Sequence, residues 1–189
     1  MRPLLLFTLT LTLTAQTWTP LFDGKSLTGW QARATFSAPA TGDWKVENGA
    51  ILCGGAQSGW LHTNAAFKNF RLQLEFRGPA GVNSGVFLRS QKDGQPHVTG
   101  YELQIWDMQP AGFHTGSLVG SIKAHPTKIK PNAWNSYDIT ATGPHFLVKL
   151  NGKTILDANE PKHSEGVIGL QCQPKQHIEF RNIRIQSLP

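Results

Sequence analysis

The stretch YELQIWD, residues 101–107, decides the fold class because its apolar and polar side chains alternate. Successive side chains of a β-strand point to opposite faces of the sheet, so Glu102 and Gln104 would share one face and the apolar residues the other. One extra residue in this strand, a β-bulge, would bring Asp107 beside them. The stretch therefore predicts an antiparallel strand with one face in the core and a row of polar groups on the other.

Short alternating stretches of the same kind recur along the chain. Asn-Gly pairs at residues 48–49 and 151–152 each separate two of them, and this dipeptide supplies the positive φ that a tight hairpin turn requires. No window of eleven or more residues shows a helical period. We therefore predict an all-β protein, a sandwich or jelly roll. The predicted strands are 44–46, 50–53, 70–77, 84–89, 101–106, 135–142, 145–150, 153–157, 166–171 and 177–186.

The first residues have the features of a secretory leader. Arg2 precedes an apolar run at 4–13 that is diluted by threonine, and small residues follow it. The run is too short to span a membrane. We predict a signal peptide over residues 1–15, a single domain over 16–189, and export to the periplasm or the extracellular space. A buried N-terminal strand is the alternative, because alternating leucine and threonine also suit a strand.

The charge pattern argues against a nucleic-acid partner. The formal net charge is +6 at pH 7, but the basic residues are scattered singly and form no basic run. No spaced set of metal ligands is present, and we expect no nucleotide or organic cofactor. The oligomeric state is left open.

The two cysteines allow two interpretations. Cys53 and Cys172 could form a disulfide in an oxidising compartment. Both also lie in predicted strand interiors, where a free cysteine serves as a small buried apolar residue.

Three consecutive predicted strands carry polar or aromatic groups on the faces that do not enter the core. If these strands pair in one sheet, the groups gather on a single surface, which would suit a sugar. They are Glu75, Phe87, Arg89, Glu102 and Gln104. The alternative is a row of cross-strand ion pairs on a solvated face. Asn83, in the glycine-rich loop beside this surface, could contact a ligand or cap its own loop, and Trp60 and Trp106 could line either a cleft or the core.

A set of motifs spread through the chain resembles the 3-keto-disaccharide hydrolase family, whose members are also described as 3-keto-glucoside 1,2-lyases and 3-keto-2-hydroxyglucal hydratases. The resemblance covers residues 18–188 and implies a concanavalin A-like jelly roll of two antiparallel sheets, export, and a carbohydrate substrate with an oxidised ring. The motifs lie at 21–30, 44–49, 83–89 (NSGVFLR), 101–105 (YELQI), 115–118, 134–135, 150–152, 168–171 and 180–185.

One stretch departs from the family pattern. After Gln171 many relatives continue with Asp-His-Gly, whereas this chain continues with Cys-Gln-Pro. If that histidine assists catalysis in relatives, proton transfer here would need a substitute such as His114 or His177.

The resemblance implies a route through the ketone. A keto group at C3 makes the hydrogen on C2 acidic, so a base can remove it and the enolate can expel the C1 substituent before water adds back. This route needs a base, a donor or cation at the 3-oxygen and a donor to the leaving oxygen. We assign Glu102 as base or acid, Arg89 to the developing oxyanion, and His114 to acid–base work or ligand contact, although His114 could equally be an ordinary loop residue. The expected substrate-binding residues are Asn83, Phe87, Gln104, Glu75, Asp107 and Gln171.

A divalent cation at the ketone is compatible with these residues. Glu102, Gln104 and a nearby histidine would offer oxygen and nitrogen ligands. The sequence itself identifies no metal.

Two other functions fit the same residues. Glu102-x-Gln104-x-x-Asp107 looks like the E-x-D-x-x-E strand of laminarinase-type glycosidases, but here the middle carboxylate is an amide, so retaining hydrolysis by paired carboxylates is poorly equipped. The other alternative is a carbohydrate-binding module without catalysis, because a fold does not decide a function.

Overall fold

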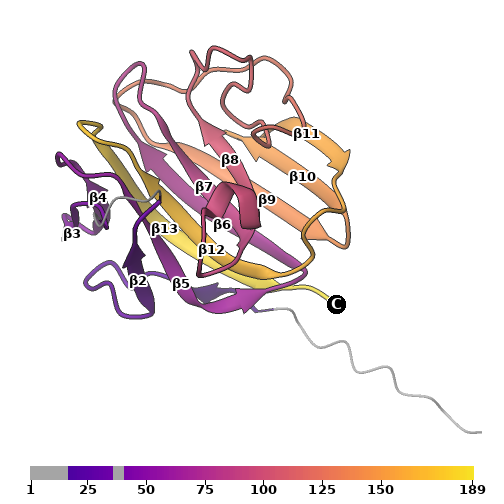
Figure 1. The fold of residues 1–189 in the computed structure, drawn as a ribbon, viewed down its shortest axis with the longest axis horizontal. Coiled ribbons are helices and arrows are strands. Elements are labelled where there is room, and N and C mark those ends of the chain that lie inside the picture. The colour runs from indigo at the N-terminus through magenta and orange to yellow at the C-terminus, as the bar shows by residue number, and fades with distance from the viewer. Residues whose placement is uncertain (1–16, 36–40) are drawn as a thin grey trace, which may run out of the picture.

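Two antiparallel β-sheets pack face to face in the computed structural model, which describes residues 17–35 and 41–189 (Figure 1). The larger sheet contains β1 (Thr19–Pro20), β3 (Trp44–Glu47), β4 (Ala50–Cys53), β6 (Phe70–Arg77), β9 (Asn135–Thr142), β10 (His145–Leu150), β11 (Lys153–Asn159) and β13 (Ile178–Ser187). The smaller sheet contains β2 (Trp30–Arg33), β5 (Gly59–Phe67), β7 (Ser84–Ser90), β8 (Tyr101–Ile105) and β12 (Gly166–Cys172). One short helix, α1 (Pro96–Thr99), connects β7 to β8.

In both sheets, strands that are distant in the sequence lie next to one another. The larger sheet runs β11-β10-β9-β6-β13-β4-β3, with β1 also paired to β13, and the smaller sheet runs β2-β5-β12-β7-β8. The prediction of an all-β chain with antiparallel sheets is confirmed, and every predicted strand is present. The strands β1, β2 and β5 were not predicted. The first half of β5 is buried on both faces, so it lacks the apolar–polar alternation that marks the other strands.

The hydrophobic core lies between the two sheets and is built from the apolar sets that alternation predicts. Leu74 and Phe76 of β6 face Val86 of β7 and Leu103 of β8 within one cluster of fully buried side chains. Burying each such side chain contributes roughly 1.5–3 kcal/mol to stability. The hydroxyl of Tyr137, in the larger sheet, donates to the carbonyl oxygen of Gln104 in β8 over 2.7 Å. The polar strand β8 is therefore fixed against the opposite sheet.

A disulfide between Cys53 and Cys172 joins β4 to β12, and so one sheet to the other. Their Cα atoms lie 5.8 Å apart, and both residues are fully buried. The structure thus selects the disulfide from the two alternatives that the sequence allowed.

The prediction that three consecutive strands form one polar surface is wrong. The strand β6 belongs to the larger sheet, whereas β7 and β8 belong to the smaller one, because the loop 78–83 carries the chain across the sandwich. Glu75 therefore lies on the outer face of the larger sheet, where Arg181 and Asn182 donate to its carboxylate over 2.6 and 3.0 Å.

The predicted leader, residues 1–15, lies outside the described residues. None of the helices in the described part of the chain is long and apolar enough to cross a membrane.

Candidate functional site

Six side chains gather on the outer face of the smaller sheet, opposite the core. Strand pairing sets Phe87 of β7 against Glu102 of β8, and Gly85 against Gln104. On the other side of β7, Gln171 of β12 pairs with Trp60 of β5. All of these side chains are buried, Glu102 being the most exposed at 7%. We call this group the Glu102 cluster, and it consists of Trp60, His62, Phe87, Glu102, Gln104 and Gln171.

The backbone of β8 is held on both sides, which fixes the position of Glu102. One side pairs with β7, and the other is bonded by the segment 116–119. The N–H of Val119 donates to the carbonyl of Glu102 over 3.0 Å, and the N–H of Gln104 donates to Ser117 over 3.0 Å. The strand is therefore not a free edge, and Glu102 lies on a rigid element.

Two glycines leave the space that the cluster fills. A Cβ on Gly85 would lie 3.1 Å from both Cγ and Oε1 of Glu102, and a Cβ on Gly169 would lie 2.6 Å from Cε3 of Trp60. The Glu102 side chain thus occupies the room over Gly85, and the Trp60 ring occupies the room over Gly169. The spacing of small residues in β7 and β12 shapes this part of the site.

Glu102 is a carboxyl group poised to exchange a proton near neutral pH. Burial raises its pKa to about 7, and a hydrogen bond of 2.9 Å from Gln171 Nε2 to its Oε1 acts in the opposite direction. Among the described residues its side chain has no cationic partner. Desolvation therefore outweighs the amide hydrogen bond and sets the direction of the shift.

Three buried polar atoms of the cluster have no hydrogen-bond partner within the described part of the chain: Trp60 Nε1, His62 Nε2 and Gln171 Oε1. Unpaired buried polar atoms are costly, so these three atoms are candidates to bond a ligand. The Nδ1 of His62 lies 2.9 Å from the carbonyl of Thr63, which can only accept, so Nδ1 carries the proton. Burial lowers the pKa of His62, so the ring is neutral near pH 7 and Nε2 is an acceptor.

Aromatic rings join the two ends of the cluster. The Trp60 ring lies 4.8 Å from the His62 ring and meets the Phe87 ring edge-on at 5.6 Å, measured between centroids. Val167 packs with Trp60 and Phe87 in an apolar cluster separate from the main core. Beside Val167 a hollow of about 310 Å³ is lined by Ala66, Ser90, Lys92, Asp93 and Gly166, among others. Trp60 and Phe87 are both fully buried, so these rings pack within the cluster and shape it from inside.

The structure brings four of the sequence-predicted residues together, namely Phe87, Glu102, Gln104 and Gln171. Gln104 uses its Oε1 to accept from the N–H of Ile105 over 3.1 Å. The Glu102 carboxyl and the Gln104 amide therefore lie in adjacent rows of one surface, as the alternation of residues 101–105 predicts.

The prediction that Arg89 shares a surface with Glu102 is wrong. Arg89 has a φ of 54°, which breaks the alternation of β7 and turns the side chain away from the Glu102 cluster. The guanidinium donates to three backbone carbonyls, those of Lys68, Gly143 and His163, over 2.6–3.1 Å, and its Cζ lies 5.2 Å from the centroid of the Phe146 ring in the core. Arg89 is therefore a buried residue that holds three loops together, and it cannot stabilise an oxyanion beside Glu102.

Asp107 also lies away from the predicted polar row. The strand β8 pairs in regular register and ends at Ile105, so the bulge that would bring Asp107 beside Glu102 is absent. Its carboxylate instead accepts from the Thr115 hydroxyl over 2.5 Å and from the N–H of Ile129 over 3.1 Å. Asp107 therefore ties together the loops that follow β8.

His114 and Asn83 occupy loops near the ends of the site strands. His114 is exposed, and its ring makes no hydrogen bond or ion pair within the described part of the chain. Asn83 is half-buried just before β7, and its backbone N–H donates to Gln176 Oε1 over 3.1 Å. The roles assigned to both residues remain predictions.

His62 was missed by the sequence analysis, which also left Trp60 open between cleft and core. The available signal was the spacing Trp60-Leu61-His62, which places the two rings on the same face of a strand. Among residues 17–35 and 41–189, no group of three or more His, Cys, Asp or Glu side chains could hold a metal ion. His62 itself is separated from Glu102 by two strands, β12 and β7.

Comparison with known proteins assigns the chain to a family. Residues 17–186 match the model of the 3-keto-alpha-glucoside-1,2-lyase-like domain. The chain belongs to this family. A curated Bacteroides thetaiotaomicron relative, named 3-keto-disaccharide hydrolase, is 27% identical over 166 residues, covering 72% of this chain and 57% of the relative. This family member thus spans little more than half the length of that relative.

Solved structures of similar proteins confirm the jelly-roll sandwich. A Parabacteroides distasonis protein, provisionally named a glycosyl hydrolase, superposes with a TM-score of 0.72 at 26% identity, covering 91% of this family member and all of its own chain (100%). The carbohydrate-binding module CBM66 from Bacillus subtilis superposes with a TM-score of 0.66 at 18% identity, covering 84% and 96% of the two chains, which shows the shared fold alone.

Proposed function

We propose that this family member cleaves the glycosidic bond of 3-keto-disaccharides, with Glu102 as the group that removes and returns a proton. The observation that carries the proposal is a buried carboxyl with a pKa of about 7, set among unpaired polar atoms and aromatic rings. A general base is most effective when its pKa lies near the working pH. The family and the name of the curated relative support the substrate class.

The proposed reaction begins at C2 of the oxidised ring. The Glu102 carboxylate takes the C2 proton, and the electron pair moves into the C3 ketone to give an enolate. The enolate then re-forms the ketone as the C1–O bond breaks, and the departing oxygen takes a proton from protonated Glu102 or from water. Water adds to C1 of the resulting 2-hydroxyglucal and a proton returns to C2, so the net result is hydrolysis.

The cluster offers hydrogen-bond donors for the negative charge that develops on the 3-oxygen. Trp60 Nε1 and the Gln104 amide nitrogen are the available donors, and they take the role that the sequence analysis gave to Arg89. Donors fixed in a buried site stabilise an oxyanion without having to reorganise. His62 Nε2 and Gln171 Oε1 would accept from sugar hydroxyls. The row from Glu102 to His62 crosses three strand spacings, roughly 14 Å at the backbone.

Replacing Glu102 by Gln tests the proposal. With 3-keto-trehalose and 3-keto-lactose as substrates, we expect turnover to fall by roughly a hundredfold or more while binding changes little. Glu179→Gln, on the other sheet, is the control and should retain turnover. Unchanged turnover in Glu102→Gln would remove Glu102 from the mechanism. Parallel assays with a chelator ask whether a divalent cation takes part.

The same assay separates an enzyme from a binding module. A module would release no aglycone from any 3-keto-glycoside and would lose affinity only gradually on Glu102→Gln. An enzyme that follows the proposed route should accumulate a 2-hydroxyglucal when the water-addition step is slowed.

We also propose that the chain works outside the cytoplasm. The leader-like residues 1–15 support export, and the disulfide between Cys53 and Cys172 suits an oxidising compartment. N-terminal sequencing of the protein from a secreting host would show whether the mature chain begins near Gln16.

A further inference from the structure

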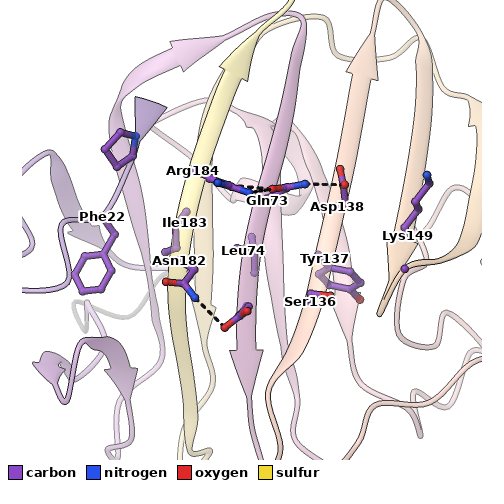
Figure 2. Close-up of a pocket in the computed structure, with 13 residues that line it drawn as sticks. Phe22, Gln73, Leu74, Ser136, Tyr137, Asp138, Lys149, Asn182, Ile183 and Arg184 are labelled. Atoms are coloured by element: carbon purple, nitrogen blue, oxygen red, sulfur yellow. Dashed lines mark hydrogen bonds between the residues drawn. The ribbon is translucent and has the colours of Figure 1, made fainter. Parts of the chain in front are cut away.

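A groove of about 570 Å³ crosses the outer face of the larger sheet, on the side of the molecule opposite the Glu102 cluster (Figure 2). Its volume lies in the range of pockets that hold small ligands, about 300–1,000 Å³. Strands β13, β6, β9 and β10 supply most of its lining, and the polar side chains that point outward from them are half-buried or exposed. The groove shares no lining residue with the proposed catalytic site.

A row of four polar side chains runs across these strands. Strand pairing aligns Arg184 with Gln73, Gln73 with Asp138, and Asp138 with Lys149. Arg184 donates to Gln73 Oε1 over 2.7 and 3.0 Å, and Gln73 Nε2 donates to Asp138 over 2.8 Å, as Figure 2 shows. The two cations therefore stand at opposite ends of the row, three strand spacings or roughly 14 Å apart at the backbone.

The acidic groups of the groove are already neutralised. Arg71 forms two hydrogen bonds to Asp138, over 2.6 and 2.8 Å, and Arg181 donates to Glu75 over 2.6 Å. Partial burial acts to raise the pKa of Asp138, but the hydrogen bonds from Arg71 and Gln73 hold it below its ordinary value. Within the described part of the chain, Arg184 and Lys149 form no ion pair. The uncompensated charge of the groove is therefore positive and lies at its two ends.

The donors and acceptors are held in place before any ligand arrives. The Trp18 ring lies 4.7 Å from the Arg184 guanidinium and 5.6 Å from that of Arg71. In the middle of the groove β13 carries a bulge, where Asn182 adopts a φ of 52° and donates to Glu75 over 3.0 Å. Bulges of this kind re-aim side chains and are common beside binding sites. Preorganised groups lose little entropy when a ligand binds.

We propose that this groove is a second saccharide site that binds an oligosaccharide with carboxylates on sugars at both of its ends. Arg184 and Lys149 would each take one carboxylate, because uncompensated cations select anions. Between them, the carboxylate, amide and hydroxyl groups of Asp138, Gln73 and Ser136 offer the mixed acceptors and donors that sugar hydroxyls need.

Calorimetric titration of the full chain with trigalacturonate and with maltotriose tests the proposal. Both are α-1,4-linked trisaccharides, but only the first carries carboxylates. We expect saturable binding of trigalacturonate and at least about tenfold weaker binding of maltotriose, as charge-assisted hydrogen bonds predict. Equal affinity for both sugars, or no saturable binding of trigalacturonate, would overturn the proposal.

Variants then place the ligand on one face. Lys149→Gln combined with Arg184→Gln should weaken trigalacturonate binding by about tenfold or more, whereas Lys162→Gln, an exposed lysine outside the groove, should leave it unchanged. The single change Lys149→Glu alters one half-exposed side chain and so keeps the test valid if the double variant folds poorly. Binding that survives all of these changes would contradict the proposal.

The second site does not depend on the proposed catalysis. Glu102→Gln should bind trigalacturonate as the parent does, and Lys149→Gln should turn over a 3-keto-disaccharide as the parent does. Loss of trigalacturonate binding in Glu102→Gln would place the ligand on the other sheet and reject the groove. Equal binding of an oligoglutamate peptide would also reject it, because general attraction of anions would then explain the result.

Discussion

Glu102 differs from the other buried or half-buried carboxylates in what lies beside it. Asp138 and Glu179 each accept from an arginine, which lowers the pKa of both although partial burial acts the other way. Glu102 accepts only from the neutral Gln171 amide, so burial prevails and raises its pKa to about 7. The fold thus keeps one carboxyl without a cation, at a cost in stability that a purely structural residue would not explain.

Replacing Glu102 by Gln should therefore stabilise the protein in mild alkali. The folded-state pKa, about 7, is raised above the ordinary 4.5, so the favourable contribution of this group is present below pH 4.5 and is lost as the pH rises through 7. A shift of this size corresponds to roughly 3 kcal/mol. Urea denaturation at pH 8 should show the variant more stable than the parent, with little difference at pH 4.

Glu179→Gln is the matched control for that measurement. Arg77 donates to Glu179 over 2.6 Å, so this substitution should lower the stability at pH 8. A Glu102→Gln variant that is less stable than the parent at pH 8 would contradict the assigned shift.

Gln171 should set the acid side of the pH–rate profile. Its hydrogen bond lowers the pKa of Glu102, so Gln171→Met, which keeps the length of the side chain but removes the donor, should raise that pKa further. The acid limb of kcat/KM should move to higher pH. Gln104→Met is the comparison, since Gln104 makes no hydrogen bond to Glu102 and its loss should leave the limb in place. If the acid limb of kcat/KM stays in place in Gln171→Met, the ionisation of Glu102 does not control the rate.

Residue patterns predicted part of the site and failed at defined points. Alternation correctly put Glu102 and Gln104 on one face of a strand, because the register of β8 is regular. It failed for Arg89, since a single positive φ at the end of β7 reverses the direction of the side chain and no neighbouring glycine signals it. His62 was missed because its strand is buried on both faces and so looks like core.

At the scale of strands, Gly85 of β7 leaves room for the Glu102 side chain because glycine has no side chain of its own. Gly85→Ala would place a methyl group 3.1 Å from Cγ and Oε1 of Glu102, so the carboxyl should be displaced and kcat should fall more than stability does. Gly85 is not among the glycines with positive φ, so we expect a stability cost of only about 1 kcal/mol. Parallel measurement of kcat and the unfolding midpoint checks this.

Val86→Ala provides the opposite pattern on the same strand. Val86 faces the core and is fully buried, so its truncation should lower stability while the kcat of the folded protein is retained. If Gly85→Ala lost stability but kept its kcat, the space over Gly85 would have no role in placing Glu102.

Strand prediction was more reliable than sheet prediction. All the predicted strands are present in the structure. They could be predicted because the alternation of side chains and the Asn-Gly turns are local signals. Assignment of strands to sheets is not local, and the short loop 78–83 gives no sign that it crosses the sandwich. Glu75 is therefore correctly predicted to lie on the non-core face of its strand, but it lies on the opposite side of the molecule from the proposed catalytic site.

At the scale of the whole molecule, the disulfide between Cys53 and Cys172 cross-links the two sheets. Cys53 and Cys172 are separated by 119 residues, so in the chain-entropy view their bond removes a large part of the freedom of the unfolded state. The double change Cys53→Ser and Cys172→Ser should lower the free energy of unfolding by roughly 4 kcal/mol. Denaturation of the parent with and without reductant should show the same shift, and coincident curves would contradict it.

The order of strands in space also governs when this protein can fold. The strand β12 lies between β5 and β7, and β13 lies between β6 and β4, so the last strands to be made occupy interior positions in both sheets. A nascent chain that has emerged from the ribosome only as far as β11 would still lack a pairing partner for five earlier strands, β1, β4, β5, β6 and β7. The chain should therefore complete its fold only after β13 has been synthesised. Chains that end before β13 should be unfolded and degraded by proteases, and they should have no partial activity.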